Sequence, residues 1–499
     1  MKVLSRLGRG ALLVSSFLIL LLLSGCAVGP DFVRPDVPSI DHYNRGGDPE
    51  ETATVNGVSQ HFDRNPGPSA EWWRSFQSRA LDSLVTLGLD ENPGLEAALA
   101  SLRQSQDNLR AGSGIFYPQL GTTFSQAREK SSQAVTGRSL PGNIFNLTTL
   151  SASVNYTLDL FGEQRRAVES LSAQVDQQRA LTLGTYMILS GNIVNTAFAV
   201  AAYRAELDEV EQLIALEKDQ AGIAEKQYQA GLTVYAGVLA LRNQLDALEA
   251  TLPPIRQKQS QSEHLLATLL GKTPAEWEPP AIMLSDITVP CRLPLTLPSE
   301  LVRRRPDILV AEARMHQASA DIGVATAAMF PGFTLNASYG RTSTFMNSLL
   351  DQKNSVWGLG ANVTASLLNG GTLASKRRAA IDAYKQSAAN YRQTVLAAFA
   401  QVADLIRALE HDAELARIEA QAVKDTRLSV DLVHANYKSG LVNYLQVILA
   451  DIQYHQARLG YLQAQVQQLQ DTTALFVALG GGWPDDARAR KAVGLEPVK

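Results

Sequence analysis

The chain has 499 residues, 45% apolar content and a formal net charge of −4. That length can bury one or more large cores, and the mildly acidic charge argues against nucleic acid as a partner. The seven histidines are scattered, and the sequence lacks a His-Glu-x-x-His motif, a Cys/His cluster, a Gly-x-Ser-x-Gly motif and paired carboxylates. We therefore predict no metal, no catalytic residues and no enzyme activity.

The first 26 residues have the pattern of a bacterial lipoprotein signal. An apolar run over 11–23 is too short to span a bilayer, and Leu23-Ser24-Gly25-Cys26 matches a lipobox. We expect residues 1–25 to be a signal peptide and Cys26 to carry a covalent lipid such as palmitate. The formal charge then changes from −4 to −7, because three cations leave: Lys2, Arg6 and Arg9. The alternative is an ordinary signal peptide with an incidental cysteine.

An alanine follows Cys26, which by analogy with bacterial lipoproteins favours release to the outer membrane. Residues 26–70 are rich in Pro, Gly, Asp and Asn, so we predict a lipid-anchored extended N-terminal segment. The only other cysteine, Cys291, has no disulfide partner and is interpreted as a passive filler.

The strongest signal beyond the N-terminus is an internal repeat. Tyr228-Gln229-Ala230-Gly231-Leu232 recurs as Tyr437-Lys438-Ser439-Gly440-Leu441, and Phe116-Tyr117-Pro118 resembles Met329-Phe330-Pro331. The offset of the first pair also relates Val238 to Val447, Gln244 to Gln453 and Gly271 to Gly480. We predict a first structural repeat over 71–271, a Pro-rich linker over 272–298, a second repeat over 299–482 and a C-terminal tail over 483–499.

Each repeat contains a pair of segments with alternating apolar and polar residues, at 118–160 and 331–368. A period of two over about ten residues is what a membrane-spanning β-strand needs. Val154 and Val363 are expected to face lipid, and Asn155 and Asn362 a lumen. The segment near 119–128 has the weakest pattern. The alternative is a half-buried hairpin of a soluble sheet.

A long helical pattern without proline follows each hairpin, over 163–227 and 371–436. At about 1.5 Å per residue each helix would reach roughly 100 Å. The second has a coiled-coil seam with 4-3 spacing: Val395, Phe399, Val402, Ile406, Leu409, Ala413, Ala416, Ala420 and Val423. Shorter helices are expected over 236–270 and 299–329, stacked end to end beside each long one.

These elements predict a shared pore. Four strands cannot close a membrane barrel, whose smallest form has eight strands, and open edges in lipid cost several kcal/mol for each unsatisfied backbone group. The polar faces consist of Gly, Ser, Thr and Asn, small residues that favour an open lumen and hence at least three subunits. The fold class is therefore mainly α with a membrane β-barrel.

Five segments together resemble the outer membrane factor family, the TolC-like channels, and its lipoprotein branch typified by OprM and NodT. They are Gly25 to Phe32, Trp72-Trp73 with Phe76, Leu301 to Ile308, Ala320 to Ala325 leading to Phe330-Pro331, and Ala478 to Trp483. The resemblance implies a homotrimer with a twelve-strand barrel and a helical periplasmic tunnel. It also implies docking to a periplasmic adaptor and an inner-membrane transporter that exports drugs or other toxic small molecules.

The resemblance further implies two kinds of site at the repeated turns. Adaptor docking would involve Tyr228, Gly231, Tyr437 and Gly440. The periplasmic gate would lie just after the second turn, where Leu445 matches the family's apolar constriction. The family's usual Leu-Asp-Ala is here Ile448-Leu449-Ala450, with an acid only at Asp451. An apolar gate at Leu445 and Leu449 is one interpretation, and helix-seam packing of both leucines is the other.

Two further motifs favour structural roles. Arg303-Arg304-Arg305 is read as a helix start that pairs with Asp307 rather than as an anion clamp, and Gly480-Gly481-Gly482 as a helix C-cap. The leading hypothesis is a passive outer-membrane exit duct of a tripartite efflux pump, lipid-anchored and extending into the periplasm. The alternatives are a protein-secretion duct and a pore-free periplasmic coiled-coil lipoprotein.

Overall fold

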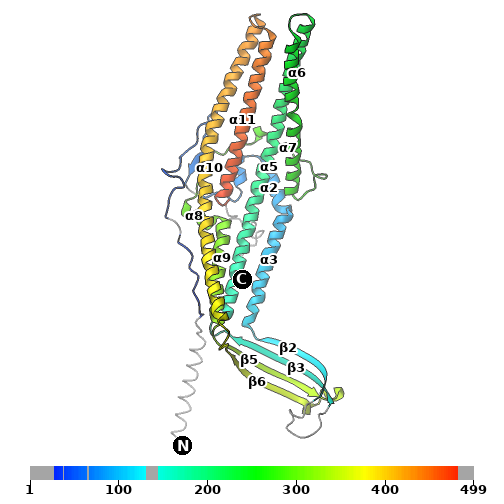
Figure 1. Cartoon of the computed structure of the whole chain (residues 1–499), viewed down its shortest axis with the longest axis vertical. Helices are drawn as coiled ribbons and strands as arrows, with labels where there is room; N and C mark the ends of the chain where they lie inside the picture. The colour runs from blue at the N-terminus through cyan, green and yellow to red at the C-terminus, as the bar shows by residue number, and fades with distance from the viewer. Residues whose placement is uncertain (1–26, 37–38, 65–66, 131–143, 482–499) are drawn as a thin grey trace. The chain divides into compact units, whose positions relative to one another are not determined.

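The computed structural model describes residues 27–36, 39–64, 67–130 and 144–481 (Figure 1), so the predicted lipid site Cys26 and the predicted tail 483–499 lie outside the described residues. The chain forms two compact units. The sheet unit takes its described residues from 1–35, 103–177 and 311–391, and the helical unit takes its own from 36–102, 178–310 and 392–499.

The sheet unit contains a four-stranded antiparallel sheet with the order β2-β3-β5-β6. Its strands are β2 (Gln119–Lys130), β3 (Ile144–Leu158), β5 (Gly332–Ser343) and β6 (Ser355–Thr364), which lie side by side in Figure 1. They fall within the two segments in which alternation predicts hairpins. The first segment, whose alternation is weak, nevertheless forms a full strand. All twelve of its residues pair with β3, and this pairing stabilises the strand although its own residue pattern only weakly predicts one.

The same order of elements surrounds each hairpin. Helix α3 (Pro93–Ser113) with the short η2 (Gly114–Phe116) precedes the first, and α9 (Pro306–Ala327) precedes the second. The hairpins are followed by α5 (Glu163–Gln229) and α10 (Thr372–Lys438), each of 67 residues and within two residues of the predicted bounds. Among the described residues, α5 alone contains an 18-residue window apolar enough to cross a membrane, and 61% of that window is buried, as in a core helix.

The shorter helices differ from the continuous segments predicted over 236–270 and 299–329. The first is divided into α6 (Tyr235–Glu249) and α7 (Leu252–Leu269), because two prolines at the start of α7 have no N–H to bond to the preceding turn. The second is divided into α8 (Pro298–Arg304) and α9, because Pro306 pushes Arg305 out of the helical conformation. Their counterpart α11 (Tyr444–Ala478) is continuous over 35 residues.

Aromatic residues form the centre of the helical unit. Trp72, Trp73 and Phe76, in the short η1 (Trp72–Phe76) before α2 (Arg79–Glu91), are at most 2% exposed. The ring of Phe76 packs edge-on against Phe198 of α5 at 5.1 Å. The seam predicted for α10 is buried in this unit at Val395, Val402, Ile406, Leu409, Ala413, Ala416 and Ala420.

The predicted tether and linker also pack into this unit. Strand β1 (His61–Asp63) pairs in parallel with β4 (Arg292–Pro294), and apolar linker residues around η3 (Leu284–Asp286) join the core: Ile282, Leu284, Ile287, Leu293 and Leu295. Their apolar residues have no regular period, so the sequence pattern did not indicate burial. Cys291 is free and exposed, so the interpretation of it as a filler is wrong.

Candidate functional site: the sheet faces and the helical turns

The strand register separates apolar from polar side chains onto opposite faces of the sheet. Because side chains alternate along a strand, each row of paired residues shares one face. One row is Leu120, Val154, Ala337 and Leu359, and its neighbour is Thr122, Ala152, Tyr339 and Trp357. We call the side that carries these rows the apolar face.

The opposite side, the polar face, carries small and amide side chains. Its rows include Gly121, Ser153, Ser338 and Gly358, and next to them Gln119, Asn155, Asn336 and Gly360. The side-chain amide of Asn362 donates a hydrogen bond of 3.2 Å to the Asn336 oxygen. A Cβ at Gly360 would lie 2.7 Å from that oxygen, so glycine leaves the room that the asparagine occupies. This face has the small, wettable composition of a lumen wall.

The apolar face is uncovered in the single chain. Leu120 is 72% exposed, Trp357 is 74% exposed and Leu359 is 77% exposed. An antiparallel sheet in water buries its apolar side against a core, and exposed apolar patches of this kind mark a membrane or protein interface. Aromatic rings border the band at both ends: Tyr339 and Trp357 pair across β5 and β6 towards the hairpin turns, and Phe161 stacks on Phe330 at 4.6 Å where the strands meet the helices. Aromatic residues flank the lipid-facing band of membrane strands in this way.

The two repeated turns of the helical unit have nearly the same geometry. Gly231 and Gly440 both have φ of +72°, the left-handed conformation that favours glycine. In the first turn the amide of Leu232 donates to the Gln227 carbonyl at 2.8 Å, and in the second the amide of Leu441 donates to the Asn436 carbonyl at 2.9 Å. These bonds satisfy carbonyls at the ends of α5 and α10.

A pair of tyrosines closes each turn. The ring centroids of Tyr228 and Tyr235 lie 5.1 Å apart, and those of Tyr437 and Tyr444 lie 5.6 Å apart. The tips expose leucine side chains, at 77% for Leu232 and 74% for Leu441. The predicted docking residues therefore form two turns with matching backbone geometry and an exposed apolar tip.

The two gate candidates share one face of α11. Leu445 and Leu449 are four residues apart and are 38% and 44% exposed, whereas Val447 and Ile448 between them are at most 3% exposed. Both leucines therefore point away from the helix packing within one chain. The third candidate, Asp451, is not beside them as an open acid: its carboxylate lies 3.5 Å from Nε2 of His434 on α10 and is 20% exposed.

A carboxyl pair lies farther along the same two helices. Burial, together with a hydrogen bond to Asp471 on α11 and the charge of that residue, raises the pKa of Asp412 on α10 to about 7. Gln467 donates to the Asp471 carboxylate at 2.9 Å. A carboxyl group with so high a pKa predicts that the stability of the folded chain depends on pH.

The residues just after Cys26 make contacts that the sequence pattern does not indicate. Asp31 pairs with the guanidinium of Arg166 at 2.6 Å, although Asp31 is 90% exposed and Arg166 only 6%. Gly29 has φ of +97° and lies so close to α9 that a Cβ would come within 2.5 Å of the Gly323 Cα. The sequence contained one usable signal, since glycine at such a position allows close backbone approach. The partner residues lie too far away in the chain for a pattern to relate them.

The chain is similar to a known protein family, to single proteins and to solved structures. A family model described as "Outer membrane efflux protein" matches residues 84–272 and 297–481. The pyoverdine export outer membrane protein OpmQ of Pseudomonas aeruginosa is 29% identical over 440 residues, covering 84% of this chain and 90% of that protein. The cation efflux system protein CusC of Escherichia coli K12 is 25% identical over 475 residues, covering 93% of this chain and 98% of that protein.

Solved structures agree in fold. The outer-membrane channel OprN superposes with a TM-score of 0.80 at 25% identity and covers 92% of this chain and 100% of its own. The outer membrane protein VceC of Vibrio cholerae superposes with a TM-score of 0.73 at 26% identity and covers 83% of this chain and 99% of its own.

Proposed function

The chain belongs to the outer membrane efflux protein family, whose model matches more than half of it. On this basis we propose that its own residues form an exit duct, as follows. It is an outer-membrane channel through which an efflux pump releases its cargo. Members of this family are the outer-membrane components of tripartite pumps. For this chain we propose export of drugs or other toxic small compounds, and no catalytic step.

The main support for this proposal is the uncovered apolar face of the sheet. Strands β2 and β6 are the two edges of the sheet, so each leaves one row of backbone donors and acceptors unpaired. In lipid such edges are tolerated only if they pair. We propose that β2 of one copy pairs with β6 of the next in a homotrimer, which closes a barrel of about twelve strands. The apolar face then meets lipid, and the polar face lines the lumen.

We propose that this layout arose by internal duplication. The order helix, hairpin, 67-residue helix occurs twice in the chain, and the family model matches two separate segments. The repeats proposed over 71–271 and 299–482 correspond closely to those segments. In the homotrimer the long helices of the three copies would continue the duct as a periplasmic tunnel.

We propose that the turns Tyr228–Gly231 and Tyr437–Gly440 dock a periplasmic adaptor protein, which connects the duct to an inner-membrane transporter. Their support is the shared geometry and the exposed leucine at each tip. Leu445 and Leu449 are proposed as an apolar gate, because both are exposed from the single chain and Asp451 is already paired with His434.

We propose that Cys26 carries the lipid, and that the residues after it anchor the chain beside the sheet. The amide of Val28 donates to the Phe161 carbonyl at 3.0 Å, and Asp31 pairs with Arg166. These contacts fix the chain within two residues of Cys26 beside the end of β3. Cys26→Ser should abolish labelling by a radioactive fatty acid, and labelling that persists would exclude this lipid site.

Conductance in planar lipid bilayers tests the duct. Purified, detergent-extracted protein should form discrete ion-conducting pores, and cross-linking should give a species of three chains. A Cys26→Ser protein that is recovered as a water-soluble, non-conducting monomer would instead support the pore-free coiled-coil lipoprotein.

A further inference from the structure

Cations gather on the apolar face at one end of the sheet, the hairpin end, where β2 ends at Lys130 and β5 at Ser343. Arg341 pairs in register with Leu150, which pairs with Phe124. Arg128 and Lys130 are separated from Phe124 by even numbers of residues, so all three cations lie on the apolar face. Arg341 lies in the row directly after the one that contains Tyr339 and Trp357, and Arg128 and Lys130 lie two and three rows farther along the same face.

No carboxylate of the described strands shares that face. The four strands contain one acidic residue, Glu129, whose odd position in β2 places it on the polar face. At the opposite end of the sheet the cation Arg165 is paired with Asp159 at 3.1 Å. Within the described part of the chain Arg341 has no such ion-pair partner. Among the described strand residues, the hairpin end of the apolar face therefore carries positive charge and no carboxylate.

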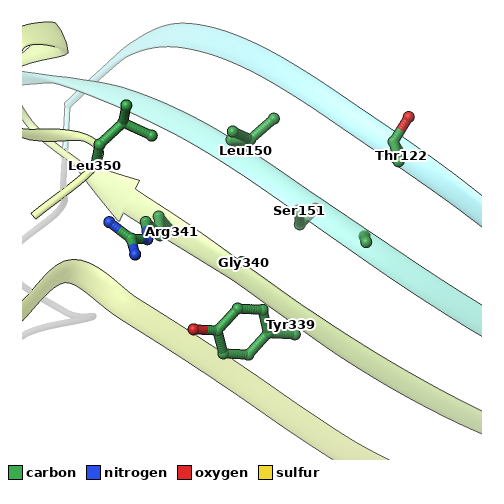
Figure 2. A pocket seen from close by; sticks show the side chains of 8 residues that line it. Thr122, Leu150, Ser151, Tyr339, Gly340, Arg341 and Leu350 are labelled. Atoms are coloured by element: carbon green, nitrogen blue, oxygen red, sulfur yellow. The ribbon is translucent and has the colours of Figure 1, made fainter. Parts of the chain in front are cut away.

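A hollow lies next to Arg341. It measures about 550 Å³, and its lining includes Leu150 and Ala152 of β3, Tyr339 and Arg341 of β5, and Leu350 from the connection after β5. Figure 2 shows Arg341 between Leu350 and Tyr339, with Leu150 on the neighbouring strand. The hollow thus combines an apolar floor with a single guanidinium at its edge.

We propose that this hollow binds an anionic lipid with a phosphate headgroup in the leaflet that surrounds the hairpin end, with the phosphate on Arg341 and an acyl chain over Leu150 and Leu350. The proposal rests on the proposed function, because it needs the apolar face to lie in a membrane. Guanidinium groups form strong charge-assisted hydrogen bonds to phosphate, and basic pockets beside membrane-spanning elements bind lipid headgroups. Arg128 and Lys130 extend the same positive rim.

The test is native mass spectrometry of the full-length protein in detergent. The protein is titrated with phosphatidylglycerol, with phosphatidylcholine of the same acyl chains, and with inorganic phosphate alone. The variants are Arg341→Gln, Arg341→Lys and the control Lys353→Gln, which removes a cation that is 77% exposed and already lies 3.6 Å from Asp351.

We expect phosphatidylglycerol to bind more tightly than phosphatidylcholine, and Arg341→Gln to weaken it about fivefold, the effect of one cation near an anionic headgroup. Arg341→Lys should keep most of the affinity, and Lys353→Gln should keep all of it. Equal binding of the two lipids, an equal loss in both glutamine variants, or displacement of phosphatidylglycerol by millimolar inorganic phosphate would each overturn the proposal.

Conductance of the wild-type protein in phosphatidylcholine bilayers, measured on the same preparation, separates the two ideas. If the protein forms pores but binds the two lipids equally, only the lipid site is refuted. If it forms no pores, the proposed function is contradicted.

Discussion

The side-chain amide of Asn362 donates a hydrogen bond to Asn336 across β5 and β6, while the next residue, Val363, lies on the other side of the sheet and is 61% exposed. One step along the strand thus separates a polar contact from an uncovered apolar side chain. The same alternation runs through all four strands, and this is what makes the sheet a candidate wall between lipid and water.

Substitution of Val154 tests which face meets lipid. Val154→Arg should lower the free energy of unfolding in lipid vesicles by about 2–4 kcal/mol if the residue lies near the bilayer midplane. Ser153→Arg, one residue away on the polar face, is the matched control and should change conductance with a smaller loss of stability. Urea unfolding in vesicles measures both variants, and equal losses would refute the assignment of the faces.

Substitution of the gate candidates tests the constriction. Leu445→Ser and Leu449→Ser should raise the resting conductance of the purified channel in planar bilayers, because a hydroxymethyl group is smaller and wettable. Leu415→Ser on α10, at a leucine 47% exposed, controls for loss of an exposed leucine elsewhere. An unchanged conductance in the first two variants would show that these leucines do not form the gate, and would favour their interpretation as helix-packing residues.

Substitution of the repeated glycine Gly440 tests whether the second turn docks the adaptor. Gly440→Ala should cost about 1–2 kcal/mol locally, because an alanine is strained at φ of +72°, and should reduce cross-linking to the adaptor at Tyr437. Gly222→Ala is the control: it lies within α5, where an added Cβ meets nothing within 4 Å, and it should leave cross-linking unchanged. Equal cross-linking yields for the two variants would remove the turn from the docking surface.

The pair of Asp412 and Asp471 predicts that the stability of the folded chain depends on pH. A carboxyl group whose pKa is about 7 in the folded protein and near 3.8 when unfolded contributes its full stability below pH 3.8, and this contribution is lost as the pH rises to about 7. Asp412→Asn should therefore have a higher Tm than the wild type at pH 8, with the difference shrinking towards pH 4. Asp425→Asn, at an exposed site of α10, controls for the lost charge. A Tm difference that does not vary with pH would contradict this coupling.

Periodicity predicted most of the regular structure. The long helices have no proline, so their bounds could be predicted to within two residues, and alternation located β3, β5 and β6. The helices predicted over 236–270 and 299–329 are interrupted at Pro253 and Pro306, because proline has no N–H for the helix and disfavours the helical conformation of the residue before it. Strand β2 depends on pairing with β3, which the pattern of its own residues does not encode.

The contacts that hold irregular segments were not predictable from pattern. The buried linker residues around Leu293 follow no period, and Arg166 meets Asp31 across 135 positions of sequence. The predicted gate residues could be located by resemblance. Their exposure, and the pairing of Asp451 with His434, depend on how α10 and α11 pack.

The central claim is that three copies share one pore through their sheet edges. The most direct measurement is the mass of the conducting species: detergent-extracted protein is separated by size, its mass is determined, and each fraction is tested in planar bilayers. We predict that conductance is confined to a fraction of three chains. Conductance from a single chain, or a homogeneous trimer that never conducts, would contradict the account.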